Sequence, residues 1–250
     1  MIHYFRAAFR LTFFAFGASF YISRYLFKSI FVGYNLDRGL RLLKELTNIL
    51  IPVLGIEIEV HGDLPKGGGL LVCNHRSYFD PFIIFKDIHA LPVGKAEIKK
   101  WPIIGTAAKV SGSIFVDRSN SESRKETRKS ISETIQKGYF VINYPEGTTH
   151  IQAQTVSFKK GMFEDAAKEN FKVFPIALEY QNENMAFIGT DTFVPHFFKA
   201  FGVSKTKIKI SYGKAINSKN TEEIITKSKQ WIDDELFKLR QNWHLSTQKK

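Results

Sequence analysis

The sequence CNHRSYFDP, residues 73–81, places a histidine and an aspartate five residues apart between two apolar runs. An imidazole that a carboxylate holds by one nitrogen presents its other nitrogen as a base. On a continuous helix, five residues would turn these side chains about 140° apart. The Asp80–Pro81 step removes this difficulty, because aspartate before proline is typical of a helix start. We therefore expect Asp80 to cap a helix while facing back toward His75. A plain polar turn is the alternative interpretation.

A second polar pair, Asp117–Arg118, follows the apolar run SIFV. An arginine directly after a strand is well placed to bind a phosphate or a carboxylate through two parallel hydrogen bonds. An ordinary surface ion pair is the alternative interpretation of Arg118.

A third polar segment, YPEGTTH at residues 144–150, follows another apolar run. Pro145 and Gly147 predict a tight turn with Glu146 at its corner. The backbone amides around Gly147 are candidates to bind an oxyanion or a phosphate, and Glu146 is a candidate to hydrogen-bond a hydroxyl-rich acceptor. An ordinary loop that contains glycine and threonine is the alternative.

Strand-like and helical segments alternate along the chain, which predicts an α/β sheet with helices on both faces. The expected strands are residues 56–60, 70–73, a short stretch within 90–112, then 113–116, 139–145, 172–180 and 207–213. The expected helices are residues 36–50, 81–88, short pieces within 90–112, 119–137 and 220–242. The helix at 119–137 is expected to begin with a capping box formed by Ser119 and Glu122.

The N-terminal segment is rich in phenylalanine, and residues 11–23 carry no charge, although basic residues flank them on both sides. This stretch is shorter than the ~20 residues that a bilayer span needs. It suits a helix that lies in the membrane interface with its aromatic side chains inserted. A bilayer span, a cleaved signal peptide and a plain core helix are the alternatives. We expect two membrane-associated helices in residues 1–54, followed by an α/β domain in residues 55–250.

The composition indicates an anionic partner, because the chain of 250 residues has a net charge of +12. Nucleic acid, anionic lipid and acidic small molecules all qualify. We expect no nucleic-acid partner, since the basic residues are dispersed and such a protein has no need of a phenylalanine-rich N-terminal segment. The single cysteine, Cys73, cannot form an internal disulfide and suggests a reducing compartment.

Taken together, these segments resemble the glycerolipid acyltransferase family, typified by 1-acylglycerol-3-phosphate acyltransferase. The family's motifs are matched by Asn74, His75, Ser77 and Asp80, by residues 115–118, by Pro-Glu-Gly-Thr at 145–148, and by an apolar strand with proline at 173–177. The stretch KAEIKKWPIIG, with Lys95, Glu97, Pro102 and Gly105, also fits. Order and spacing agree over roughly residues 56–215.

The resemblance implies a mixed sheet flanked by helices and direct acyl transfer without a covalent enzyme intermediate. His75, oriented by Asp80, would take the proton of the acceptor hydroxyl, which would attack the thioester of acyl-CoA or acyl-carrier protein. The product would be phosphatidic acid in phospholipid synthesis, with no cofactor and no metal. Arg118 would hold the acceptor phosphate. The implied substrate-binding set also contains Asn74, Ser77, Glu146, Gly147 and Thr148.

One departure from the family concerns the acceptor headgroup. Many lysophosphatidate enzymes have an arginine after Glu-Gly-Thr, whereas this chain has Thr149 followed by His150. Lys159 and Lys160, in the sequence FKKGMF, are the candidate replacements for that cation. Otherwise the acceptor would be another lysolipid, such as lyso-ornithine lipid or a lysophospholipid with a headgroup.

The resemblance also implies a location. A lipid substrate in an anionic bilayer places the protein at a membrane surface, which we expect to be the cytoplasmic face of a bacterial inner membrane. A non-catalytic membrane scaffold of the same fold is the alternative from another class. Such a scaffold would be expected to lack His75 or Asp80, and both are present.

Overall fold

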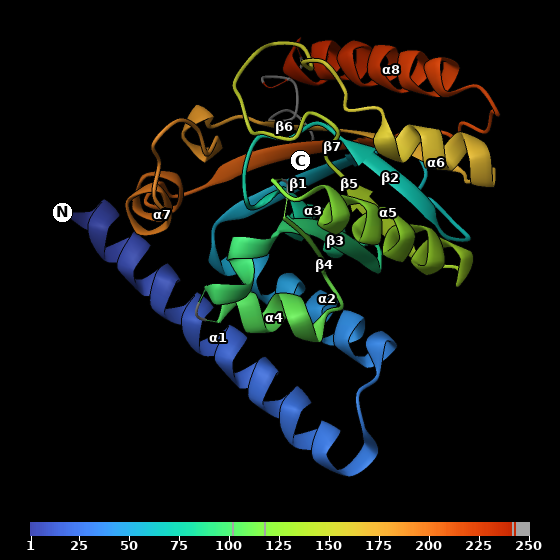
Figure 1. Ribbon diagram of the computed structural model, residues 1–250. Coiled ribbons are helices and arrows are strands. Elements are labelled where there is room, and N and C mark those ends of the chain that lie inside the picture. The colour runs from blue at the N-terminus through green and yellow to red at the C-terminus, as the bar shows by residue number, and fades with distance from the viewer. Residues whose placement is uncertain (102, 118, 242, 244–250) are drawn as a thin grey trace.

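The computed structural model describes residues 1–101, 103–117, 119–241 and 243 (Figure 1). Its strands are β1 (Ile56–His61), β2 (Gly69–Cys73), β3 (Ala90–Lys95), β4 (Ile114–Val116), β5 (Phe140–Asn143), β6 (Val173–Tyr180) and β7 (Thr206–Tyr212). Its α-helices are α1 (Ile2–Val32), α2 (Leu36–Val53), α3 (Asp80–Phe85), α4 (Ile104–Val110), α5 (Ser121–Gln136), α6 (Gly161–Glu169), α7 (Phe193–Phe201) and α8 (Thr221–Gln241). Two short 3₁₀ helices are η1 (Ala96–Lys100) and η2 (Glu183–Met185).

The seven strands of the described chain form one mixed sheet in the order β1-β7-β6-β2-β5-β3-β4. Neighbouring strands are parallel except β6 and β7, which are antiparallel. The strands β6, β2, β5, β3 and β4 therefore share one direction, and their C-terminal ends meet at one edge of the sheet. Ligands of open α/β sheets bind at that edge. The expected strands and the mixed α/β fold are confirmed.

Helices cover both faces of the sheet, as the apolar strand sequences predict. Successive side chains of a strand point to opposite faces. On β2, Leu71 and Cys73 join the core that contains residues of α1, α2, α3 and α7. Leu70 and Val72 join a second core with residues of α5, α6 and α8. Every residue of β2 and β6 is buried, so the centre of the sheet is a rigid platform for the loops at its edge.

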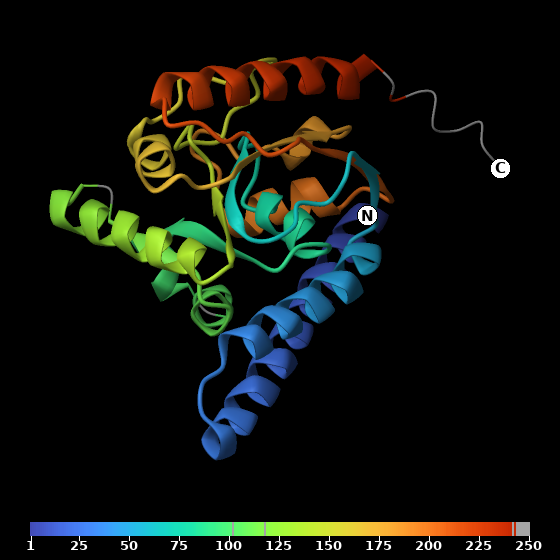
Figure 2. The same ribbon diagram turned by 90° about the vertical axis from the view of Figure 1, so that its right-hand side faces the viewer.

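The two N-terminal helices form an antiparallel pair that projects from the body of the molecule (Figure 2). One stripe of α1, which includes Arg10, Phe14 and Ala18, is buried against the domain. The opposite side carries exposed aromatic side chains: Phe5, Phe9, Phe16, Phe20, Phe27 and Phe31. Within the described residues, none of the helices has both the length and the hydropathy needed to cross a bilayer. Two helices are present in residues 1–54, as expected, and α1 is longer than its charge-free centre suggested.

One local prediction in this region needs correction. The capping residue of α5 is Asn120 rather than Ser119, because the Asn120 side chain accepts hydrogen bonds from the backbone amides of Glu122 (2.9 Å) and Ser123 (3.1 Å). Ser119 instead donates its hydroxyl to Asp117. The helices α6 and α7 were not predicted. The predicted start of α8 is confirmed, and its predicted end at residue 242 lies outside the described residues.

Candidate active site

The turn that follows β2 begins with an asparagine that continues the sheet. The Asn74 side chain donates to the carbonyl oxygen of Leu178 (2.9 Å) and accepts from the backbone amide of Leu178 (2.8 Å). Asn74 is fully buried. This side chain therefore ties the end of β2 to β6 and determines the direction in which the chain leaves the sheet toward His75.

Asp80 is the centre of this turn and has no exposed surface. Its Oδ2 accepts hydrogen bonds from His75 Nδ1 (2.7 Å), the Arg76 amide (2.7 Å) and the Ser77 amide (3.0 Å). Its Oδ1 accepts from the Tyr180 hydroxyl (2.6 Å). A buried carboxylate is tolerated only when such donors satisfy it. The structure thus brings His75 and Asp80 together as the sequence predicts.

The predicted capping role of Asp80 is wrong in its detail. The helix α3 is capped at Phe79, with no side-chain hydrogen bond, and Asp80 is its first residue. The carboxylate points back into the preceding turn, where it accepts backbone amides of the turn rather than of the helix. Pro81 occupies the first turn of α3, where its missing N–H has no cost.

The contacts of Asp80 assign the proton on His75. Because Oδ2 already accepts two backbone N–H groups, it is an acceptor toward the imidazole, so Nδ1 carries the proton. The lone pair then lies on Nε2, for which no hydrogen-bond partner is found among the described residues. The ring stacks on Tyr144 with centroids 4.0 Å apart, and 20% of the side chain is exposed. His75 therefore presents an accessible basic nitrogen at the edge of the sheet.

Glu146 holds the loop after β5 against the same turn. Its side chain is fully buried. It accepts hydrogen bonds from the His75 amide (2.8 Å), the Val156 amide (2.9 Å) and His150 Nε2. The predicted tight turn is present, since Gly147 has φ 72° and donates its amide to the Tyr144 carbonyl (3.0 Å). In this structure the Glu146 carboxylate thus contacts protein groups and positions the backbone of His75.

His150 extends this network to Arg76. The His150 Nδ1 atom lies 3.1 Å from Arg76 Nη1 and 3.2 Å from the Gln152 amide, and both of these are donors. Nδ1 is therefore the acceptor, and Nε2 carries the proton that is donated to Glu146. Arg76 also donates to the His150 carbonyl (2.9 Å) and is buried. Loop and turn are joined by a closed ring of hydrogen bonds.

The remaining predicted residues take different places. Ser77 is buried, and its hydroxyl has no hydrogen-bond partner within the described chain. Thr148 is exposed at the surface of the loop. The Lys159 side chain lies across Gly147, where an added Cβ would be 2.6 Å from the ammonium nitrogen. Arg118, like Pro102, lies outside the described residues.

Two tyrosines at the site were missed by the sequence reasoning. Burial, together with the nearby Asp80 carboxylate, raises the pKa of Tyr180 and also that of Tyr144. The Tyr180 hydroxyl therefore stays protonated and donates to Asp80. Tyr180 is the last residue of β6, which is parallel to β2, so it lies at the same edge of the sheet as His75. A polar side chain after an apolar run was the signal that could have found it. Burial also raises the pKa of Cys73, which keeps this neighbour of the site a thiol.

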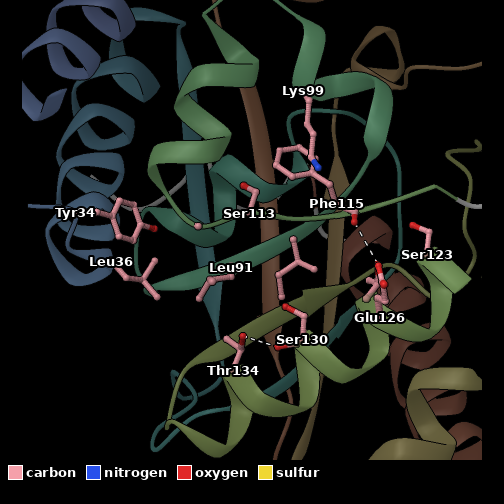
Figure 3. A pocket seen from close by; sticks show the side chains of 13 residues that line it. Tyr34, Leu36, Leu91, Lys99, Ser113, Phe115, Ser123, Glu126, Ser130 and Thr134 are labelled. Atoms are coloured by element: carbon pink, nitrogen blue, oxygen red, sulfur yellow. Dashed lines mark hydrogen bonds between the residues drawn. The ribbon is translucent and has the colours of Figure 1, made fainter. Parts of the chain in front are cut away.

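A cavity of about 510 Å³ lies elsewhere, along β4 and α5 (Figure 3). Tyr34 and Leu36 line one part of it, and Lys99 reaches over the ring of Phe115 at another. A row of hydroxyl side chains from α5 completes the lining. None of the lining residues belongs to the turn or the loop around His75, so the cavity is a feature separate from that centre.

Comparison with known proteins supports the reading of these motifs. Residues 57–179, which contain β1 to β6 almost entirely, match the model of the family described as Acyltransferase. Residues 57–179 are thus similar to an acyltransferase domain. The His75–Asp80 pair and the Glu146 loop both lie within the matched region.

Individual relatives align with this chain at modest sequence identity. It is 30% identical over 145 residues to the 1-acyl-sn-glycerol-3-phosphate acyltransferase of Neisseria meningitidis, which is 57% of each chain. The chain thus spans little more than half of that relative. It is 25% identical over 195 residues to the lyso-ornithine lipid O-acyltransferase of Pseudomonas aeruginosa, which is 75% of each chain.

A solved structure shares the fold. The crystal structure of the 1-acyl-sn-glycerophosphate (LPA) acyltransferase from Thermotoga maritima superimposes with a TM-score of 0.73 at 18% identity, over 96% of each chain. At this identity, the match shows likeness of fold.

We expect Tyr180→Phe to lower the free energy of unfolding by about 1–3 kcal/mol, because Asp80 then loses one of four donors in a buried place. Chemical denaturation in detergent measures the change. Tyr212→Phe is the matched control, since the Tyr212 hydroxyl is buried without a partner in the described chain. Equal costs for the two variants would contradict the role given to the Tyr180 hydroxyl.

Proposed function

We propose that this protein transfers a fatty acyl group from a thioester to the free hydroxyl of a lysolipid. The observation that carries the proposal is the hydrogen bond of 2.7 Å between His75 Nδ1 and the buried Asp80, which leaves Nε2 as an accessible base. The similarity of residues 57–179 to an acyltransferase domain supports the same reaction. The donor is acyl-CoA or acyl-carrier protein, and the reaction needs no cofactor.

The reaction follows from the two states of one imidazole. Nε2 of His75 takes the proton of the acceptor hydroxyl as its oxygen attacks the thioester carbonyl, and a new C–O bond forms. Asp80 stabilises the imidazolium that results and preserves the orientation of the ring. The C–S bond then breaks, and the imidazolium returns its proton to the leaving thiolate. Tyr144, stacked on the ring, limits its rotation.

The acceptor that we favour is 1-acylglycerol-3-phosphate, which makes phosphatidic acid the product. The name of the meningococcal relative supports this choice. Arg118 and Lys159 are the cations that we assign to the acceptor phosphate. The Lys159 ammonium has no ion pair within the described residues, and its stem crosses Gly147, next to the Glu146 that binds the His75 amide.

A lyso-ornithine lipid is the second candidate acceptor, and a specific observation favours it. Thr149 stands where lysophosphatidate enzymes have arginine, and its hydroxyl donates to the Phe187 carbonyl. The loop therefore turns no cation toward the acceptor at this position. The relative from Pseudomonas aeruginosa, which aligns over the greater share of the chain, is named for that lipid.

The exposed aromatic side of α1 supports action at a membrane surface. Phe9 and Phe16 are 64% and 75% exposed, and exposed apolar patches of this kind mark interaction sites. With a net charge of +12, the protein is attracted to anionic headgroups. We assign α1 to the interface of the bilayer, on the cytoplasmic face of a bacterial inner membrane.

The base assignment predicts that His75→Ala abolishes acyl transfer while the protein still folds. Asp80→Asn should retain the fold, since its amide can keep the hydrogen bonds if the Tyr180 hydroxyl reverses, but turnover should fall by about 10³-fold or more. The assay uses purified protein in detergent with a panel of lysolipids and both thioester donors. Turnover near that of wild type in His75→Ala would refute the assignment.

The headgroup assignment predicts that Lys159→Met raises the KM for 1-acylglycerol-3-phosphate about tenfold or more, because a hydrogen bond to a charged group contributes about 1.5–3 kcal/mol. The KM for the thioester should not change. Lys160→Met is the control, since Lys160 pairs with Glu222 on α8. If both variants bind the acceptor equally well, Lys159 does not contact the phosphate.

The membrane assignment predicts that the double variant Phe9→Ser, Phe16→Ser loses at least about tenfold in binding to anionic vesicles, because each inserted phenylalanine contributes about 1.5–3 kcal/mol. Its melting temperature should not change. Phe237→Ser, also an exposed phenylalanine but on α8, is the control. Deleting α1 is the poorer test, since its buried stripe belongs to the core. Unchanged flotation of the double variant with vesicles would exclude this face as the membrane contact.

A further inference from the structure

Arg10 connects the aromatic helix α1 to the rest of the domain. Only 6% of the residue is exposed. Its guanidinium donates to four backbone carbonyls: Nε to Val53 (2.9 Å), Nη1 to Phe201 (2.8 Å) and Val203 (2.6 Å), and Nη2 to Ser204 (2.8 Å). A guanidinium is a donor in all directions of its plane and accepts nothing. Four carbonyls around one buried guanidinium form a complete site for it.

Two of these four carbonyls are ones that a helix leaves unpaired. Val53 is the last residue of α2 and Phe201 the last residue of α7. The final carbonyls of a helix lack intrahelical partners and carry the negative end of its dipole. Arg10 therefore satisfies the C-terminal ends of two helices at once. Gly55 leaves the room for it, since an added Cβ there would lie 2.1 Å from Nη2.

The helices that Arg10 joins also contact the turn that carries His75. On α7, His196 Nδ1 lies 3.2 Å from the hydroxyl of Tyr78. On α1, Phe14 packs edge-on against Phe82, with ring centroids 6.3 Å apart. Tyr78 and Phe82 lie two residues before and two residues after Asp80. Contacts from α7 and from the buried stripe of α1 therefore reach residues on both sides of Asp80 in the sequence.

We propose that Arg10 is a positioning residue for acyl transfer at the bilayer. It fixes α1 to α7 and to the turn around Asp80, so that His75 stands at one height above the membrane in which α1 lies. The inference rests on the proposed function. A loosely attached helix would keep the protein at the membrane but would let His75 move relative to the acceptor hydroxyl. Rates of transfer depend steeply on such positioning.

The test compares two acceptors that share a headgroup, one held in a vesicle and one dissolved in water. Arg10→Met removes the donors and keeps the apolar stem. Arg24→Met is the control on the same helix. The Arg24 side chain is 59% exposed, and its ion pair with Glu45 is long, at 3.9 Å. Transfer is measured to 1-oleoylglycerol-3-phosphate in vesicles of phosphatidylethanolamine and phosphatidylglycerol, and to the water-soluble 1-hexanoylglycerol-3-phosphate. Vesicle binding is measured by flotation.

We expect Arg10→Met to bind vesicles as wild type does and to keep its rate with the soluble acceptor. Its rate with the vesicle acceptor should fall about tenfold or more. Arg24→Met should change neither rate. An equal loss with both acceptors would mean that Arg10 only stabilises the fold, and no loss with either would mean that it positions nothing. Both results would overturn the proposal.

A second measurement does not depend on catalysis. Trp101 contacts Phe193 at the start of α7. In a background with Trp231→Phe and Trp243→Phe it is the single tryptophan, so its quenching by lipids brominated at different depths reports the height of this region. Adding Arg10→Met to this background should change the quenching profile. If Arg10→Met does not fold, Arg10→Lys, which keeps the charge, takes its place. An unchanged profile would overturn the proposal. If wild type transfers no acyl group to any lysolipid, the proposed function fails, while the profile still tests the fixed height.

Discussion

The buried carboxylate of Asp80 is the constraint on which the rest of the site depends. Removing a carboxylate from water costs several kcal/mol unless donors replace the solvent. The chain supplies those donors from the turn itself, from the His75 imidazole and from Tyr180 at the end of β6. Each donor is fixed in turn by another element, since Asn74 joins β2 to β6 and Glu146 binds the His75 amide. Satisfying one charge therefore determines the path of the turn, the tautomer of His75 and the place of the loop after β5.

Arg10 carries the opposite charge to Asp80, and backbone carbonyls satisfy it. Asp80 is neutralised in large part by backbone N–H groups, and Arg10 by backbone carbonyls at the ends of α2 and α7. Both charges sit where the chain changes direction, because turns and helix ends are the places where backbone groups lack regular partners. Phe14 belongs to the larger of the two cores, and Phe82 packs against it. The aromatic helix is therefore part of the frame that supports the site, and the core of the α/β domain is incomplete without it.

The sequence predicted the features that local patterns determine. Apolar runs located the strands. Polar residues after β2 and β5 located the edge of the sheet at which the site lies. One prediction failed because it depends on where a side chain points. Asp80 was expected to cap α3, but its carboxylate turns toward the amides of the preceding residues. The contact of Glu146 with the acceptor stays a prediction, and in the structure its carboxylate is buried against His75 and His150. A carboxylate at a strand end suits either direction, and only the tertiary contacts decide. The helices α6 and α7 were missed because each has only nine residues, too few for a clear periodic signal.

The loop after β5 departs from the pattern of many lysophosphatidate enzymes at Thr149, while its turn keeps the expected form. An arginine after Glu-Gly-Thr would bring a fixed positive charge toward the acceptor. Here Thr149 is bound to Phe187 and His150 to Glu146 and Arg76, so both side chains are used within the protein. The tautomer of His150 leaves it neutral, because two donors converge on its Nδ1. Charge for an anionic headgroup must then come from outside the loop, and the Lys159 side chain lies across Gly147 of the motif. A flexible ammonium discriminates less by geometry than a guanidinium does, so an acceptor site built on Lys159 would accept a wider range of headgroups than one built on arginine.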